Sequence, residues 1–176
     1  MPRTVPRSPQ PTLSPSGDRD RLSVGPEALF VYGSLQFPEV LFALIDRVPH
    51  REPAAAEGWR VATLPERVYP GLVPGSTTAR GFLLSGLTIQ EWRVLDAFED
   101  SGYELLRIDL ADGRHGWTYV WDAGVEVGPD DWSAEDFEAH HLPAFVVRCE
   151  AWRRRYETSE QVNQSPGSRP GLRIRD

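Results

Sequence analysis

Short apolar stretches alternate with turn residues along most of this chain, and this alternation constrains its fold more than any other feature. The clearest case is the pair of alternating stretches at residues 103–110 and 117–121, which flank Asp112-Gly113. An Asp-Gly pair between such stretches predicts a tight β-hairpin, because its turn needs residues that tolerate positive φ angles. Further strands are predicted at residues 28–32, 58–64 and 79–84.

Helices are expected between these strands. Pro38 opens the first, because proline fits the first turn of a helix. Thr88 and Glu91 form a capping-box pattern that starts the second. Ser133 caps a third, which Pro143 interrupts before an apolar stripe continues. Short strands in hairpins with few helices predict an α+β fold around a small antiparallel or mixed sheet, either open or closed as a barrel.

A single folded domain is expected at residues 27–157. The chain has 176 residues, which is enough for one hydrophobic core and short for two. Residues 1–26 and 158–176 are rich in polar residues, proline and arginine and poor in apolar ones. Segments of that composition cannot bury enough surface to order themselves, so both are predicted to be disordered tails.

The composition excludes several classes of function. The net charge of −7 is concentrated in the domain and argues against nucleic-acid binding, which needs clustered positive charge. All 19 basic residues are arginine, so no lysine can form a Schiff base or serve a P-loop. No apolar run has the length of a membrane span, and no secretory signal is visible. The lone Cys149 excludes an internal disulfide and fits a reducing, cytoplasmic compartment.

Glu99 is the candidate for acid–base chemistry. It follows the apolar side of the predicted helix at residues 88–98, which places it beside Trp92 and Leu95. Partial burial, the helix C-terminus and nearby acidic residues would all raise its pKa, as a base working near neutrality requires. The alternative is a solvated carboxylate at a helix end.

The segment Tyr32-Gly33-Ser34-Leu35 is the candidate anion site. A strand that breaks at glycine exposes successive backbone N–H groups, which can hold a carboxylate. A simple turn is the alternative. Ser34 is not expected to be a nucleophile, because Tyr32 and Gln36 stand where the G-x-S-x-G motif requires glycines.

No metal site is expected. His140 and His141 are adjacent on a helix and cannot face one ion, because ligands on one helical face lie about three or four residues apart. The aromatic residues Trp117, Tyr119 and Trp121 share one strand face, which is more typical of a core than of a ligand platform.

Several motifs occur in the order of a known family: Tyr32-Gly33-Ser34-Leu35, Arg67-Val68-Tyr69-Pro70-Gly71, Arg80-Gly81, Leu95-Asp96-Ala97-Phe98-Glu99, and Tyr103 with Arg107. Together they resemble the γ-glutamylcyclotransferase-like family, in particular its AIG2-like and γ-glutamylamine cyclotransferase branch. Glu104, Leu105 and Leu106 widen the last motif relative to the family pattern.

This resemblance implies a small mixed β-barrel with flanking helices and a cofactor-independent reaction. The family's enzymes release 5-oxoproline and a free amine from a γ-glutamyl compound, so a small γ-glutamyl substrate is expected and no cofactor. Glu99 matches the catalytic glutamate. The backbone of Tyr32, Gly33, Ser34 and Leu35 would bind the substrate, and Tyr103 would form a hydrogen bond near the reacting end.

Two other functions remain open at this point. One is a non-catalytic AIG2-like protein that binds a small molecule in the same pocket. The other is a tailoring enzyme that removes a γ-glutamyl protecting group from a biosynthetic intermediate. The sequence identifies neither the leaving amine nor the oligomeric state.

Overall fold

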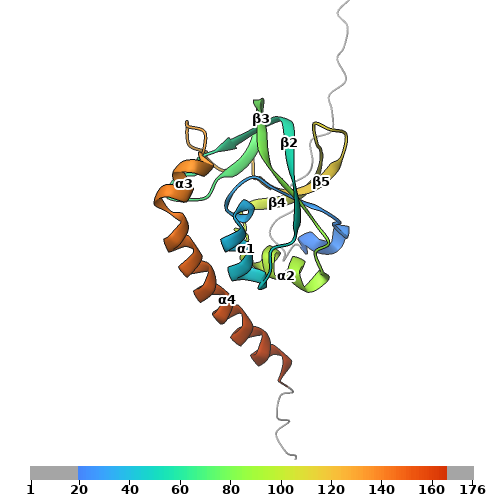
Figure 1. Cartoon of the computed structure of the whole chain (residues 1–176), viewed down its shortest axis with the longest axis vertical. Helices are drawn as coiled ribbons and strands as arrows, with labels where there is room; N and C mark the ends of the chain where they lie inside the picture. The colour runs from blue at the N-terminus through green and yellow to red at the C-terminus, as the bar shows by residue number, and fades with distance from the viewer. Residues whose placement is uncertain (1–19, 166–176) are drawn as a thin grey trace, which may run out of the picture.

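The computed structural model describes residues 20–165, which form an α+β domain with a five-stranded mixed sheet and flanking helices, as predicted (Figure 1). Its elements are β1 (Leu29–Val31), α1 (Pro38–Ile45), β2 (His50–Ala62), β3 (Gly71–Ser85), α2 (Ile89–Phe98), β4 (Tyr103–Asp109), β5 (His115–Trp121), α3 (Ala134–His140) and α4 (Leu142–Gln164). Two short 3-10 helices, η1 (Arg21–Val24) and η2 (Ser34–Gln36), precede and follow β1.

The strand order of the sheet is β2-β3-β1-β5-β4. Two antiparallel hairpins, β2–β3 and β4–β5, are joined through β1, which is antiparallel to β3 and parallel to β5. The hairpin predicted at Asp112-Gly113 is confirmed, and Gly113 has the positive φ of 90° that favours glycine there.

β1 is the shortest strand, and its end creates the place for a site. Beyond Val31 the chain leaves the sheet, and the strands on either side, β3 and β5, pair directly with each other at Leu72 and Val120. The residues that follow β1 therefore lie outside the sheet, at the point where β3 and β5 pair directly with each other.

The sheet curls but is not closed by a strand pairing among residues 20–165. Its edge strands β2 and β4 are unpaired with each other in the strand order. The turn after β4 nevertheless reaches β2, because the N–H of Ala111 donates to the carbonyl of Ala55 at 2.8 Å. Arg114 in the same turn also binds the Glu52 carboxylate and the Pro53 carbonyl of β2, so the barrel expected from the resemblance is a curled five-stranded sheet whose edges are bridged by a turn.

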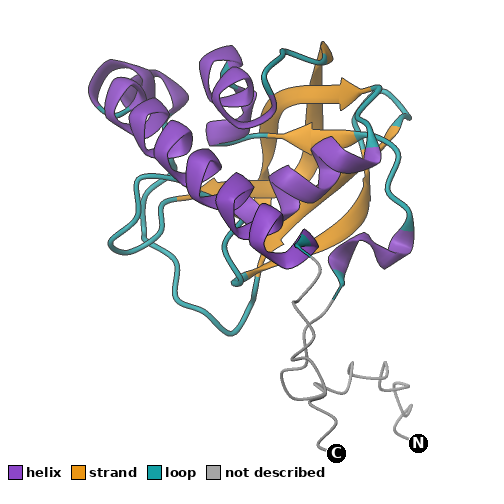
Figure 2. Ribbon diagram, turned by 90° about the horizontal axis from the view of Figure 1, so that it is seen from below, coloured by secondary structure: helices purple, strands orange, loops and turns teal. Residues whose placement is uncertain are grey.

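Both faces of the curled sheet are covered. The four α-helices gather on one side of it (Figure 2), and the larger core cluster lies between them and the sheet. A second cluster fills the inside of the curl. In β1, Leu29 and Val31 belong to the first cluster and Phe30 belongs to the second. Burial on both faces explains why this strand is an uninterrupted apolar run.

The helix starts follow the predicted signals. Pro38 occupies the first turn of α1, Thr88 and Glu91 form the capping box of α2, and Ser133 caps α3. Pro143 lies in the first turn of α4, so the predicted interruption is the boundary between two helices. The long α4 packs against α1 and α3 and runs along one side of the molecule (Figure 1).

Two strands are longer than predicted. The stretches at residues 58–64 and 79–84 are parts of β2 and β3, which form one long hairpin with a bulge between Glu57 and Trp59. The first half of β2 contains Pro53 and a run of alanines, which have low β-propensity. Proline is tolerated there because β2 is an edge strand.

Parts of the predicted tails are ordered. Residues 21–24 form η1, whose Leu22 packs against the larger core, and α4 continues to Gln164. The domain therefore extends beyond 27–157 on both sides. Residues 1–19 and 166–176, which make up the rest of the predicted tails, lie outside the described residues. No helix between residues 20 and 165 has the length and apolar character needed to cross a membrane.

Candidate functional site

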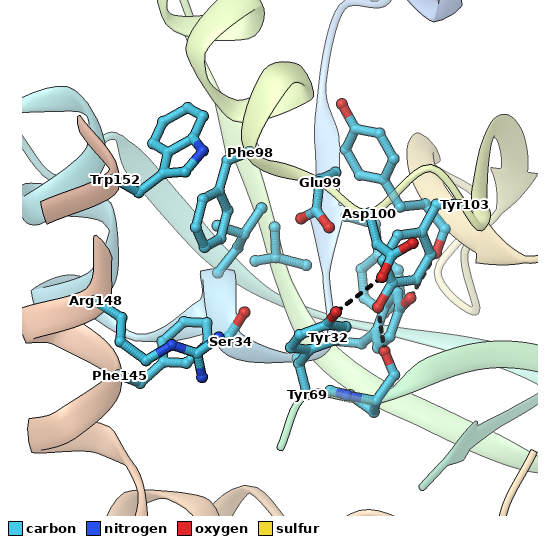
Figure 3. A pocket seen from close by; sticks show the side chains of 16 residues that line it. Tyr32, Ser34, Tyr69, Phe98, Glu99, Asp100, Tyr103, Phe145, Arg148 and Trp152 are labelled. Carbon is cyan, nitrogen blue, oxygen red and sulfur yellow. Dashed lines mark hydrogen bonds between the residues drawn. The ribbon is translucent and has the colours of Figure 1, made fainter. Parts of the chain in front are cut away.

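A cavity of about 310 Å³ opens where β1 leaves the sheet. Its walls come from segments far apart in the sequence: the end of β1 with η2, the loop before β3, the turn between α2 and β4, and α4 (Figure 3). All the residues predicted for the site line it, namely Tyr32, Gly33, Ser34, Leu35, Glu99 and Tyr103. The fold thus brings the two candidate segments together in one pocket.

Glu99 enters the pocket because α2 ends one residue before it. Glu99 is the C-terminal cap of α2, and its φ and ψ of −69° and 138° are extended rather than helical. Its carboxylate projects into the cavity (Figure 3). Its N–H still donates to the carbonyl of Leu95 at 3.1 Å, as the predicted helical period requires, while the side chains of Trp92 and Leu95 belong to the core.

The surroundings of Glu99 favour its protonated form. Burial raises its pKa to about 8, and the negative charges of Asp96 and Asp100 act in the same direction. The positive charge of Arg21 opposes them. The pocket leaves the carboxyl group partly accessible, so a ligand can reach a carboxyl group that titrates close to neutrality.

Asp100 lies next to Glu99 in the chain, but its pKa is shifted in the opposite direction. It accepts hydrogen bonds from the Tyr69 hydroxyl at 2.8 Å and the Gly102 N–H at 2.9 Å, and it pairs with Arg67 at 3.2 Å. Burial acts to raise the pKa of Asp100, but these partners lower it below its ordinary value. Asp100 is therefore a fixed anion that organises the pocket wall, whereas Glu99 can exchange a proton.

The segment after β1 forms the wall opposite Glu99. Gly33 precedes η2, and Ser34 and Leu35 are its buried first residues. A Cβ atom at Gly33 would lie 2.9 Å from the ring carbons of Pro70, so only glycine lets the two segments approach this closely. The first N–H groups of a 3-10 helix have no partner within the helix. The backbone of this wall therefore stays the candidate anion site predicted from the sequence.

Hydrogen bonds of Tyr32 connect that wall to the sheet. Its buried hydroxyl donates to the carbonyl of Tyr119 in β5 at 2.5 Å and accepts from the N–H of Leu72 in β3 at 3.2 Å. These are the strands that pair directly once β1 has ended. The hydroxyl therefore satisfies backbone groups at the junction and fixes the position where η2 begins.

Tyr103 and Tyr119 place neutral phenols beside Glu99. The Tyr103 hydroxyl donates to the carbonyl of Pro70, and the Tyr119 hydroxyl donates to Asp96 at 2.8 Å. Burial, reinforced by neighbouring ionisable groups, raises the pKa of both tyrosines far above the ordinary value. Both phenol hydroxyls therefore stay protonated at physiological pH, and their oxygens keep lone pairs that can accept a hydrogen bond.

Helix α4, together with Phe98 of α2, supplies an aromatic wall of the cavity. The ring of Phe98 meets those of Phe145 and Trp152 edge to face, with centroids 6.1 and 5.1 Å apart. Arg148 lies on the same side of the cavity, with its guanidinium 5.6 Å from the Phe145 centroid (Figure 3). No carboxylate among the described residues forms an ion pair with this exposed arginine.

Sequence reasoning missed several contributors to the site. Tyr119 was assigned to the core, which is correct, but it also lines the pocket. Arg21 was assigned to a disordered tail although it contacts the turn that carries Glu99. Phe145 and Trp152 were recognised only as an apolar stripe. Their helical spacing signals one buried face, but nothing in a single sequence shows which cavity that face covers.

Metal-ligating side chains are not clustered in the described part of the chain. No group of three or more His, Cys, Asp or Glu residues within 20–165 is placed to hold an ion. Cys149 is a buried free thiol, and burial raises its pKa to about 12. Such a thiol is inert as a nucleophile.

Comparisons with known proteins identify the family of this chain. The family described as "Gamma-glutamyl cyclotransferase, AIG2-like" matches residues 29–139, from β1 to the end of α3. The chain is 38% identical over 128 residues to AIG2-like protein C of Arabidopsis thaliana, covering 68% of this chain and 73% of that protein. It is 33% identical to AIG2-like protein D of the same plant, covering 68% and 84%.

Solved structures show the same architecture. A solution structure of an Arabidopsis thaliana protein matches with a TM-score of 0.53 and 26% identity, covering 85% of this chain and all of that one. A crystal structure of an uncharacterised Pyrococcus horikoshii protein shares the fold with a TM-score of 0.51 at 17% identity, covering 65% and 97%. This chain belongs to the AIG2-like γ-glutamyl cyclotransferase family, which is a family of enzymes.

Proposed function

We propose that this protein is a γ-glutamyl cyclotransferase that releases 5-oxoproline and a free amine from a γ-glutamyl amine or peptide. The substrate's α-amino nitrogen attacks its own γ-carbonyl carbon, and a new C–N bond closes the lactam ring. The C–N bond to the leaving amine then breaks. The proton removed from the α-amino group is returned to the leaving nitrogen, so the reaction needs neither water nor a co-substrate.

The observation that carries the proposal is the Glu99 carboxyl group in the pocket with a pKa raised to about 8. A base with a pKa near the working pH combines a useful ionised fraction with a strong tendency to take a proton. The same group, once protonated, is an effective acid for the departing amine. One glutamate can therefore perform both transfers, because the nucleophile and the leaving group share one carbonyl carbon.

The wall from Tyr32 to Leu35 is proposed to bind the glutamyl end of the substrate. Its backbone N–H groups suit the α-carboxylate, which is the anionic part of every γ-glutamyl compound. Binding there would hold the flexible glutamyl chain bent toward Glu99. Because the reaction is intramolecular, this restriction alone lowers the barrier substantially.

Tyr103 is proposed to orient the attacking amine. Its own proton is committed to Pro70, so toward the pocket its oxygen acts as an acceptor. An acceptor at this position suits an ammonium or amine N–H and does not suit an oxyanion. The raised pKa of Tyr103 keeps the phenol neutral, so it does not compete with Glu99 for the proton.

The side of the cavity formed by α4 is proposed to receive the leaving group. Phe98, Phe145 and Trp152 give it an apolar aromatic surface, and Arg148 adds a positive charge without a carboxylate partner among residues 20–165. This combination favours a leaving amine with an apolar body and a carboxylate, as in a γ-glutamyl aromatic or aliphatic amino acid.

The test is the release of 5-oxoproline from a substrate panel, measured together with the free amine. The panel contains γ-glutamyl-phenylalanine, its decarboxylated counterpart γ-glutamyl-phenethylamine, and γ-glutamyl-ε-lysine. Equal amounts of 5-oxoproline and amine from any member support the proposal. If 5-oxoproline raises the melting temperature but no member is turned over, the pocket is a binding site and the proposal is wrong for this panel's chemistry.

The two phenyl compounds also resolve the orientation. If Arg148 pairs with the leaving group's carboxylate, kcat/KM is higher for γ-glutamyl-phenylalanine, and Arg148→Gln removes that preference. If Arg148 instead holds the glutamyl α-carboxylate, Arg148→Gln lowers kcat/KM for both compounds equally, and the proposed orientation is wrong.

A further inference from the structure

Arg21 makes an unusual set of contacts for a residue outside the family-matched region. Its guanidinium donates to four backbone carbonyls, those of Asp96 at 2.7 Å, Glu99 at 3.3 Å, Asp100 at 3.1 Å and Tyr103 at 3.2 Å. Its Nε also pairs with the Asp96 carboxylate at 2.9 Å. Every guanidinium nitrogen is thus engaged with the end of α2 or with the turn that follows it.

The short helix η1 holds Arg21 in place. The side chain of Asp20 accepts from the N–H of Leu22, and Gly25 ends the helix with a φ of 65° and a hydrogen bond back to the Leu22 carbonyl. The Leu22 side chain packs against the larger core. The Arg21 side chain keeps only 16% of its surface exposed and lies over the ring of Tyr119, at 5.2 Å.

Two of the four carbonyls that Arg21 binds, those of Asp96 and Glu99, belong to the C-terminal end of α2, and the other two belong to the chain that follows it. The last turn of a helix has carbonyls without partners, and they carry the negative end of the helix dipole. α2 ends at Phe98 and the chain turns sharply through Glu99 and Asp100 into β4. A planar guanidinium can bridge several carbonyls at once, which a lysine ammonium does less well.

Arg21 also sets the charge balance around Glu99. The groups that face Glu99 from the sheet are the neutral phenols of Tyr32, Tyr103 and Tyr119. Asp96 and Asp100 flank it, and α4 contributes Arg148 at the pocket and the neutral thiol of Cys149. Of the charges that act on the pKa of Glu99, those of Asp96 and Asp100 raise it, and that of Arg21 lowers it.

We propose that Arg21 is the positioning residue of the active site: by clamping the turn between α2 and β4 it aims Glu99 into the pocket and places a positive charge beside it. This inference rests on the proposed function for its kinetic readout. It assigns a role in the chemistry to a segment that precedes the family-matched region and that composition alone marks as a tail.

The test compares Arg21→Gln and Arg21→Lys in the full chain, with Arg47→Gln as a matched control. Arg47 clamps the other end of α2 in a similar way, donating to the Glu91 carboxylate at 2.6 Å and to the Gly86 carbonyl at 2.9 Å, but it does not line the pocket. The loss of either arginine removes an ion pair and a helix-end contact, so a purely structural effect lowers the melting temperature in both variants.

The distinguishing readout is the pH profile of kcat/KM. Without the charge of Arg21, we expect the limb that reports Glu99 to move about one unit upward. At pH about 7 that shift lowers kcat/KM about tenfold, because the ionised fraction of Glu99 falls by that factor. Arg21→Lys keeps the charge, so it returns the limb toward its original position, while kcat stays below wild type because the carbonyl clamp is incomplete.

A second readout does not depend on turnover. With carbon-13-labelled glutamate, the signal missing from Glu99→Gln identifies Glu99, and its titration is followed without substrate. A higher midpoint in Arg21→Gln than in Arg47→Gln supports the inference even if no cyclotransferase substrate is found. Identical midpoints in these two variants overturn it, whatever the kinetics show.

Discussion

The two ends of helix α2 are built by opposite means. At the N-terminal end, Thr88 and Glu91 are neighbours in the sequence and form a capping box with each other, and Arg47 adds an exposed ion pair. At the C-terminal end, the local cap is a backbone hydrogen bond from the Glu99 N–H to the Leu95 carbonyl. A distant arginine, Arg21, binds the last carbonyls, and Glu99 turns away from the helix axis into the pocket.

The difference shows in the carboxylates at the two ends. Hydrogen bonds from Arg47 lower the pKa of Glu91, whereas burial raises the pKa of Glu99 to about 8. The first glutamate stabilises the fold as an anion, and the second is held in surroundings that disfavour the anion. Under the proposed function, one end of α2 serves stability and the other serves the reaction, so variants at one end are controls for variants at the other.

The largest expected effect is kinetic and belongs to Glu99→Gln. We expect kcat for 5-oxoproline release to fall about 10²–10⁴-fold, the usual contribution of a general acid–base group, because glutamine cannot exchange a proton. Steady-state rates of wild type, Glu99→Gln and Glu91→Gln on one substrate measure this. Glu91→Gln should retain the wild-type rate. Equal losses in the two variants would mean that neither end of α2 is specific to the chemistry.

The second effect is the gain in stability of Glu99→Gln at high pH. The pKa of Glu99 is above its unfolded value, so as the pH rises from 4.5 toward 8 the unfolded chain ionises first and the wild type loses stability. Glutamine has no such loss. Denaturant unfolding should show a difference near zero below pH 4.5 that grows up to about pH 8, with an upper limit of about 5 kcal/mol.

At the N-terminal end of α2, we expect the effect of Glu91→Gln on stability to have the opposite pH dependence and a smaller magnitude. The pKa of Glu91 is below its unfolded value, so its contribution to stability is present above pH 4.5 and is lost as the pH falls through the lowered folded-state pKa. Glu91→Gln should cost about 1 kcal/mol near pH 7, because the pair with the half-exposed Arg47 is solvent-screened. A cost that persists unchanged in acid would show that the charge is not its source.

The smallest effect is expected for Thr88→Ala. The Thr88 side chain accepts from the N–H of Glu91 at 3.1 Å, and losing such a cap costs about 1 kcal/mol or less. Thermal unfolding measures the loss, and kcat/KM should not change. A parallel fall in activity would indicate that the helix transmits changes from its N-terminal end to Glu99, which would weaken the distinction between the two ends.

The same contrast explains what could be predicted from the sequence. The start of α2, the start of α1 and the hairpin at Asp112-Gly113 depend on residues within a few positions of one another. Such signals are readable in one sequence. Glu99 and the Tyr32–Leu35 segment became candidates through their motifs, and the structure places them in one pocket.

The remaining features depend on contacts between distant segments. The role of Arg21 depends on a turn about 80 residues later in the chain. The conformation of Glu99 depends on where α2 stops, because helix periodicity alone continues past that point. The assignment of Phe145, Arg148 and Trp152 to the pocket depends on how α4 docks. Local patterns contain none of this information.

The most direct test of the account is the pKa of Glu99 in the free protein. Carbon-13 NMR of the labelled carboxyl groups, with Glu99→Gln to assign the signal, gives the titration midpoint without reference to any substrate. The account predicts a midpoint near 8, with Glu91 titrating below its ordinary value in the same spectra. A Glu99 midpoint near the ordinary 4.5 would contradict it, because the pocket would then hold only a solvated carboxylate at a helix end.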